Sequence, residues 1–375
     1  MRLAIALSIF LLVPVSCGGS FDDLGDRGDA ATTVPDSSDE TVVCEPGQAD
    51  GDLYLYNWAD YIDPDLVAQF EMEFEVEVLT DTYDSNEALL TKLQSGAVYD
   101  LVVPSNDMVT TMIEQGLLAQ LQTSAVPNVG NLMPTFRSPP YDPDGAYSVA
   151  YQWGTTGLAV DTSLAGDGLE PSWSLVFDAD MVSQYPSGIA MMEDARETMG
   201  AALKYLGYSL NSTRESELQE AADVIAGVSE YISMLSEEDS AGALLNDGVT
   251  VSHLTSKSPL TGDDDQDEGA RFAYVVPEEG TSLWVDSMAI TANAEHPCTA
   301  HALINFILEP EHGAALSNWT RLASPNRASE EFILPEILED EAIYPPEDIR
   351  ERLEIISDLG ELEGEYSDYL AIARR

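Results

Sequence analysis

The chain has 375 residues, of which 44% are hydrophobic, so it is long enough for two domains with buried cores. It carries 68 acidic residues against 15 Lys and Arg, a formal net charge of -53, and such an acidic surface repels nucleic acid and anionic lipid headgroups. These two classes of partner are therefore excluded. Because the acid is spread along the whole chain, we interpret it as adaptation to a salty medium, where like-charge repulsion is screened over roughly 3 Å at 1 M salt. Attraction of a polycation is the alternative.

The N-terminal residues predict export from the cytoplasm. One arginine precedes an apolar run from Leu3 to Val15, which is too short to span a bilayer and is typical of a signal peptide over residues 1–16. Cys17 follows a small residue, as in the lipobox of bacterial lipoproteins, and is predicted to be the lipidated N-terminus of an extracytoplasmic protein that touches the membrane only through its lipid anchor. Residues 17–52 are rich in Asp, Gly, Ser, Thr and Pro and are expected to form a disordered tether. An ordinary secreted protein, cleaved nearby, is the alternative.

Two further cysteines, Cys44 and Cys298, are expected to form a disulfide. Thiols outside the cytoplasm usually pair when geometry permits. The disulfide would tie the segment before the first strand to the first lobe. Two free, buried thiols are the alternative.

After the tether the sequence alternates strand and helix patterns. Leu53–Asn57 has the period-two pattern of a short strand, and Asp63-Pro64 is typical of the start of a helix. Val76–Leu79 and the continuous apolar run Tyr99–Val103 predict two more strands, and Asp84–Glu87 resembles a capping box that begins the helix between them. The βαβαβα order predicts a doubly wound α/β unit.

The second half of the chain predicts another α/β lobe and extended crossings between the two. Tyr147–Val160 holds two extended runs around Gly154, and Leu283–Ile290 alternates as a strand that returns to the first lobe. Further strands are expected at Gly188–Met192, Val249–His253 and Ala273–Val276, and helices at Glu215–Leu235 and over most of Pro335–Arg375. We expect lobe 1 to comprise residues 53–155 and 285–328, and lobe 2 to comprise residues 156–284 and 329–375. Such lobes form a hinge, and small-ligand sites favour the cleft between them.

The sequence holds no motif of enzymatic or metal chemistry that we recognise. Its histidines and cysteines lack zinc spacing, and it has no GxSxG elbow, no Walker-type loop and no GxGxxG after a strand. The acidic run Asp263–Glu268 lacks the ligand spacing of a calcium loop. We therefore predict a protein that is not an enzyme, needs no cofactor and binds no metal.

Acidic and aromatic residues stand together at the end of the first predicted strand. Trp58, Asp60 and Tyr61 form the loop after it, at the edge where open α/β sheets place their ligands. An organic cation is stabilised by π faces along its stem and by an anion at its charged head, so this loop is a candidate site for one. The rings could instead only pack the corner between strand and helix.

Two further pairs combine the same residue types. Asp194 and Glu197 are three residues apart at a helix start, where they could bind a ligand or form a capping box that satisfies free amides. Trp284 and Asp286 are two apart on a predicted strand and so point to one face, although they could be ordinary core and surface residues. Four carboxylates at strand ends and crossings favour a cation site.

These residues lie in segments that resemble the spermidine/putrescine-binding proteins of bacterial polyamine ABC importers. The shared segments, in the same order, are YNWADY, YDSNE, YDLVVPS, YQWGTTGLAV, DARE, LGYS and WVDSMAITANA, and the resemblance runs from Leu53 to Tyr369. It implies an α/β, two-lobed periplasmic-binding-protein-like fold of type II, in which each lobe is a sheet flanked by helices and crossing strands form the hinge. It also implies a monomeric substrate-binding protein that delivers a polyamine to the transmembrane subunits of an ABC permease.

The resemblance assigns roles to individual residues. In the family the tryptophan of the first loop packs along the polyamine's methylene chain, and the acid and tyrosine after it contact an ammonium end. The DARE pair binds along the cleft, and the tryptophan and aspartate of the crossing strand bind the chain and an amine. The ligand-binding residues expected here are Trp58, Asp60, Tyr61, Asp107, Asp194, Glu197, Trp284 and Asp286.

The sequence departs from the family mainly in aromatic residues. Asn106-Asp107 stand where spermidine-type members place an aromatic residue, and the tryptophan expected near Val251–Thr255 is absent. Leu322 replaces a tyrosine, and no glutamine stands near Ile356. The expected ligand is a polyamine of the putrescine or spermidine class. Another small organic cation or solute is the alternative, and a secreted hydrolase that uses the carboxylates is the alternative from a different class of protein.

Overall fold

The computed structural model describes residues 42–166, 170–236, 240–256 and 271–374. The predicted signal peptide, Cys17, most of the predicted tether and the acidic run Asp263–Glu268 lie outside the described residues. Within these ranges no helix is both long enough and apolar enough to cross a membrane.

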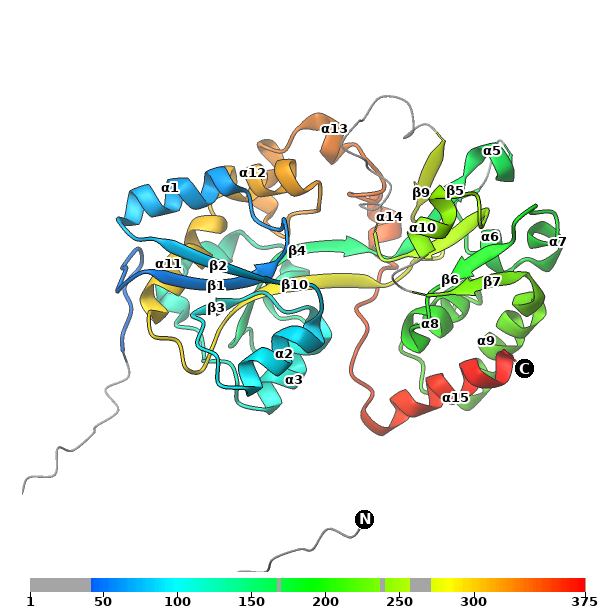
Figure 1. Cartoon of the computed structure of the whole chain (residues 1–375), viewed down its shortest axis with the longest axis horizontal. Coiled ribbons are helices and arrows are strands. Elements are labelled where there is room, and N and C mark those ends of the chain that lie inside the picture. The colour runs from blue at the N-terminus through cyan, green and yellow to red at the C-terminus, as the bar shows by residue number, and fades with distance from the viewer. Residues whose placement is uncertain (1–41, 167–169, 237–239, 257–270, 375) are drawn as a thin grey trace, which may run out of the picture. The chain divides into compact units, whose positions relative to one another are not determined.

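The first sheet has five strands in the order β2-β1-β3-β10-β4 (Figure 1). Strands β1 (Leu53–Trp58), β2 (Val78–Tyr83) and β3 (Leu101–Val102) are parallel, whereas β10 (Leu283–Ile290) runs antiparallel to both β3 and β4 (Ser148–Thr155). The helices after the parallel strands are α1 (Pro64–Phe74), α2 (Asn86–Gln94) and α3 (Asn106–Glu114), and α11 (Pro297–Ile307) and α12 (Pro310–Thr320) follow β10. The predicted doubly wound unit is therefore present.

Two helices around this sheet begin within the segments that the sequence predicts, although the cap of α2 is Ser85 and not Asp84, the first residue of the predicted capping box. The Asp63 side chain accepts a hydrogen bond from the amide of Asp65, with Pro64 at the first helical position, and Ser85 accepts from the amide of Ala88. Side chains alternate between the two faces of β1. Leu53 and Leu55 pack with α1, α11 and α12, whereas Tyr56 packs on the opposite face with α2 and α3.

The second sheet also has five strands, in the order β7-β6-β8-β5-β9. These strands are β5 (Gly157–Asp161), β6 (Ile189–Met191), β7 (Ile232–Leu235), β8 (Val251–Leu254) and β9 (Phe272–Val275). One face packs on α8 (Ala195–Tyr205), α9 (Glu215–Val228) and α15 (Glu363–Ala373), and the other on α10 (Ser240–Leu245). Two α/β units, each a sheet flanked by helices, confirm the predicted fold class.

Two predicted helices are wrong in part. The helix expected over Glu215–Leu235 ends at Val228, because Ile232–Leu235 pairs in parallel with β6 as an edge strand. The C-terminal part is less helical than expected, because Glu354 pairs with the start of β10: its amide donates to the carbonyl of Thr281, and its carbonyl accepts from the amide of Leu283. Long-range pairing overrides local helical preference at both places.

The chain's last third contacts both cores. Ile337, Tyr344 and Ile355 pack with residues of the first sheet, whereas Tyr366 and Leu370 pack with those of the second. The boundaries predicted from the sequence place all of residues 329–375 in lobe 2. Short helices are α4 (Pro134–Arg137), α5 (Thr162–Ala165), α6 (Ser174–Phe177), α7 (Ala179–Val182), α13 (Pro335–Leu338) and α14 (Glu347–Arg350), with 3-10 turns at Thr123–Ala125, Pro127–Asn131, Ser229–Tyr231, Arg327–Glu331 and Gly360–Leu362.

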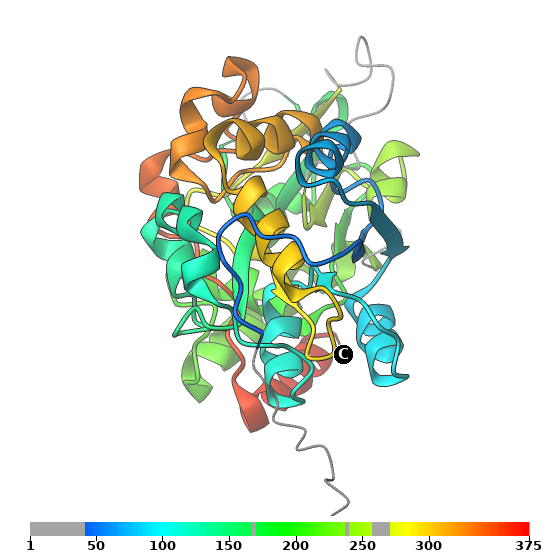
Figure 2. The ribbon, with the colours of Figure 1, turned by 90° about the vertical axis from the view of Figure 1, so that its left-hand side faces the viewer.

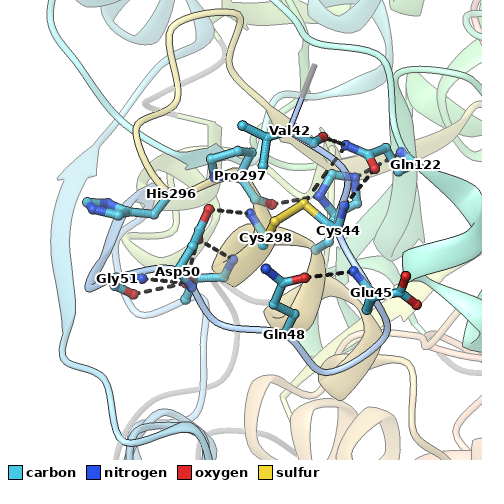
Figure 3. The surroundings of a disulfide bond; sticks show 12 residues. Val42, Cys44, Glu45, Gln48, Asp50, Gly51, Gln122, His296, Pro297 and Cys298 are labelled. Carbon is cyan, nitrogen blue, oxygen red and sulfur yellow. Dashed lines mark hydrogen bonds between the residues drawn. A yellow bond between two sulfur atoms is a disulfide. The ribbon is translucent and has the colours of Figure 1, made fainter. Parts of the chain in front are cut away.

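The segment before β1 is fastened to α11, over which it runs in Figure 2. The predicted disulfide between Cys44 and Cys298 is present, with the two sulfurs 2.03 Å apart (Figure 3). The carboxylate of Asp50 accepts hydrogen bonds from the amides of Cys298 at 3.2 Å and Thr299 at 2.9 Å. This carboxylate satisfies amides that are free at a helix N-terminus, so a covalent bond and a cap hold the same segment.

Candidate functional site

One cavity of about 370 Å³ brings together side chains from both sheets. The predicted site residues that line it are Asp107, Asp194, Glu197 and Trp284. The remaining lining residues are Asn86, Ser105, Asn106, Met192, Arg196, Thr255, Ser282, Leu283, Ile356 and Glu363. Residues that are far apart in the sequence therefore share one hollow.

Asp194 is at once a helix cap and a cavity residue. It stands between β6 and α8, and its Oδ1 accepts a hydrogen bond from the amide of Glu197 at 2.8 Å. The side chain is exposed, and it lines the cavity. The capping and ligand-binding interpretations of this residue are therefore compatible.

Glu197 joins α8 to the two chain crossings between the sheets. Its Oε1 accepts a hydrogen bond from Thr156 Oγ1 at 3.1 Å, and its Oε2 accepts one from Ser282 Oγ at 2.7 Å. Thr156 lies between β4 and β5, and Ser282 directly precedes β10. The two hydroxyls fix this carboxylate at the cavity wall.

Trp284 presents its ring to the cavity because the neighbouring strand carries a glycine. Gly154 of β4 pairs with Trp284 of β10, and a Cβ at Gly154 would lie 2.2 Å from Cζ2 of the indole. The indole Nε1 donates to the carbonyl of Thr255 at 2.7 Å, just beyond β8 of the second sheet. The ring is thus held between the two sheets.

Asp286 is buried beside the cavity. Its carboxylate accepts hydrogen bonds from Tyr61 OH at 2.5 Å and from Ser105 Oγ at 2.6 Å, and Ser105 lines the cavity. Burial raises the pKa of the Asp286 carboxyl to about 6, and the charge of Asp107 contributes to the rise, whereas the two hydrogen bonds oppose it. Burial, followed by the charge of Asp286, also raises the pKa of Tyr61 well above its usual value, so the tyrosine remains a donor.

Asp107 lies in the first turn of α3, the helix that follows the carboxyl end of β3 in the first sheet. Desolvation raises the pKa of its carboxyl, and the charges of Glu87 and Asp194 raise it further, whereas hydrogen bonds from backbone amides lower it. A second carboxylate across the cavity therefore makes ionisation of Asp107 less favourable. A cation between Asp107 and Asp194 would relieve this repulsion.

Of the three predicted site residues at the end of β1 and in the loop after it, only Tyr61 is hydrogen-bonded to another predicted site residue. Trp58 is half-buried against Tyr83, with ring centroids 4.6 Å apart, and its Nε1 donates to the carbonyl of Val103 at 2.9 Å. Asp60 is exposed, with a positive φ of 52°, and neither Asp60 nor Trp58 is among the residues that line the cavity. Tyr61 reaches the site through Asp286, as described above.

Two charged residues that line the cavity are not among the site residues predicted from the sequence. Arg196 lies inside the DARE segment and donates to Glu363 Oε1 at 3.1 Å and to the carbonyl of Ser357 at 2.9 Å. The DARE segment was therefore a signal for Arg196. Glu363 comes from the C-terminal helix, and no local pattern marks it.

The charges of the cavity favour a cationic ligand. Arg196 is the only basic residue that lines it within the described part of the chain, and its guanidinium is already paired with Glu363. Four acidic residues line the cavity against this one arginine: Asp107, Asp194, Glu197 and Glu363. The described residues contain no group of three or more His, Cys, Asp or Glu placed to hold a metal ion. An ammonium group, which offers three donors and no acceptor, matches such a surface.

The sequence matches both a family model and individual known proteins. The family model described as bacterial extracellular solute-binding protein matches residues 65–345. The spermidine/putrescine-binding periplasmic protein of Escherichia coli (strain K12) is 32% identical over 320 residues, which are 84% of this chain and 90% of that protein.

Solved structures agree in fold along nearly the whole described chain. The spermidine/putrescine ABC transporter substrate-binding protein PotD from Streptococcus pneumoniae, in complex with calcium and HEPES, is 31% identical with a TM-score of 0.80, over 87% of this chain and 100% of that chain. The Tp0655 (TpPotD) lipoprotein of Treponema pallidum is 31% identical with a TM-score of 0.73, over 86% of this chain and 99% of that chain.

Proposed function

Because this chain belongs to the bacterial extracellular solute-binding proteins, we propose that it binds a polyamine of the putrescine or spermidine class in the cavity lined by Asp194 and Trp284. It then delivers the polyamine to the transmembrane subunits of an ABC permease and performs no chemistry on it. We also propose that the protein is anchored by a lipid on Cys17 and acts as a monomer whose two lobes close about the crossing strands.

The observation that carries this proposal is the convergence of acids from both sheets on one cavity. Asp107 comes from α3 beside the first sheet, whereas Asp194 is the N-cap of α8 and Glu197 lies in its first turn, beside the second sheet. Burial of an unpaired ammonium group costs several kcal/mol, so a site for one needs several carboxylates. The indole of Trp284 offers a π face that can bury methylenes and attract the charge, by about 0.5–2 kcal/mol.

The alternative of a secreted hydrolase receives no support from this geometry. Both oxygens of Glu197 accept hydroxyl hydrogen bonds from Thr156 and Ser282, so the group is held in place and engaged. Asp194 caps α8 through one oxygen. These contacts suit a fixed binding surface better than proton transfer.

A calorimetric and thermal-shift panel tests the proposal. The ligands are putrescine, cadaverine, spermidine and spermine, with amino acids and sugars as controls, measured in 1 M salt to screen general attraction to an acidic surface. Saturation at 100 times Kd stabilises the fold by about 2.7 kcal/mol, which is readily detected. Stoichiometric binding of amines alone would support the proposal. Binding of a neutral sugar or of no amine would refute it.

A further inference from the structure

A second cavity continues the candidate site along α3. Its volume is about 520 Å³, and it shares four lining residues with the first: Asn106, Asp107, Ile356 and Glu363. Because these four residues line both cavities, we treat the two cavities as one continuous groove. The groove is therefore longer than the part that holds Asp194 and Trp284.

One wall of the extension is a single face of α3. Asp107, Thr110 and Glu114 line it at positions i, i+3 and i+7. With a rise of 1.5 Å per residue, seven residues place Glu114 about 10 Å further along the helix axis than Asp107. Carboxylates thus mark both ends of this wall.

Two other segments complete the lining of the extension. Ser357 and Asp358 come from the segment between α14 and α15, and Tyr141, which is 8% exposed and precedes β4, contributes an aromatic ring whose hydroxyl lies 3.1 Å from Ser287 Oγ. Within the described part of the chain, no basic residue lines the extension. The extension therefore combines two carboxylates, Glu114 and Asp358, with hydroxyls and a ring.

We propose that the groove binds a linear polyamine longer than a diamine, of the tetra-amine type represented by spermine, with one end near Asp194 and Trp284 and the other between Glu114 and Asp358. This inference rests on the proposed function and specifies the length of its ligand. A diamine occupies only the first cavity and does not contact the residues of the extension. Glu114 and Asp358 are thus specificity-determining residues, which select for length.

The test compares ligands of different length on matched variants. The double variant Glu114→Gln/Asp358→Asn removes two charges from the extension. The control Glu73→Gln/Asp223→Asn removes two charges from exposed positions on α1 and α9, outside both cavities. Calorimetry with putrescine and spermine in 1 M salt measures both dissociation constants, so that the loss of general charge attraction is the same in the two variants.

The expected result is a change for one ligand only. Spermine should bind the wild type at least tenfold more tightly than putrescine, and the double variant should lose about tenfold for spermine and less than twofold for putrescine. The control variant should keep the wild-type ratio. Equal losses in both variants, or an unchanged spermine affinity in the double variant, would overturn the inference while leaving the proposed function intact. Failure of every amine to bind the wild type would overturn both.

Discussion

The indole nitrogen of Trp284 donates a hydrogen bond to the carbonyl of Thr255 at 2.7 Å, which links a strand of the first sheet to the end of a strand of the second. The ring reaches this position across the backbone of Gly154. One side chain therefore lines the cavity that we propose as the ligand site and links the two lobes. Changes that displace this ring should affect both ligand binding and the contact between the lobes.

Gly154→Ala should displace the indole. The added methyl group would lie 2.2 Å from the ring, so we expect a loss of about 1–3 kcal/mol in the free energy of unfolding and weaker amine binding. Urea denaturation and calorimetry measure the two effects. Gly227→Ala in α9, where no atom lies within 4 Å of the new methyl group, is the control and should stabilise by about 0.4–1 kcal/mol. Equal changes in unfolding free energy and amine affinity in the two variants would show that the backbone of Gly154 does not set the position of the indole.

Asp194→Asn should separate the two roles of this residue. Asparagine caps a helix about as well as aspartate, so the free energy of unfolding without ligand should change by less than about 0.5 kcal/mol, while most of the thermal shift given by a polyamine is lost. The control is Asp178→Asn, because Asp178 caps α7 in the same lobe and lines neither cavity. It should leave both quantities unchanged. A lower melting temperature with a preserved ligand shift would make Asp194 a cap only.

Asp286 should make both stability and binding depend on pH. Its folded pKa of about 6 lies above the ordinary value of 3.8, so the folded state binds the proton more tightly. The stability that this group contributes is complete below about pH 4 and is lost as the pH rises through 6, to an extent on the order of 3 kcal/mol. Urea denaturation from pH 4 to 8 should therefore show Asp286→Asn gaining stability relative to the wild type as the pH rises.

Polyamine binding should change in the opposite direction with pH. A cation near the ionised carboxylate of Asp286 lowers its pKa, so binding expels a proton below about pH 6 and affinity should increase with pH up to that value. Calorimetry in buffers of different ionisation enthalpy detects the released proton. A dissociation constant that is independent of pH between 5 and 7 would mean that no ammonium group approaches Asp286.

Removal of the disulfide should destabilise the protein without affecting the ligand. Cys44 and Cys298 are 254 residues apart in the sequence, and loss of such a cross-link typically costs about 2–5 kcal/mol of unfolding free energy. Neither cysteine lines the cavities described above, so Cys44→Ala/Cys298→Ala should keep the wild-type affinity for polyamines at temperatures where it is folded. A changed affinity in the folded double variant would contradict this independence.

Local signals predicted much of the fold correctly. The cap at Asp63, the parallel strands around Leu53 and Leu101, and the pairing of Cys44 with Cys298 all follow from patterns that neighbouring residues or the cysteine count supply. The strand at Ile232–Leu235 is not predicted from the sequence, because this segment is stabilised as a strand by its pairing with β6.

The sequence by itself determined the two α/β units, the disulfide and the acids and rings at strand ends, because these depend on short-range patterns of polarity and on residue type. Only the tertiary structure decided which of those acids share a hollow: Asp107, Asp194 and Glu197 line one cavity with Trp284, whereas Asp60 remains exposed outside it. It also decided that Arg196 and Glu363 pair there and that the cavity extends to Glu114 and Asp358. The reason is physical, since a cavity is defined by contacts between segments up to hundreds of residues apart, and those contacts are fixed by packing around both cores.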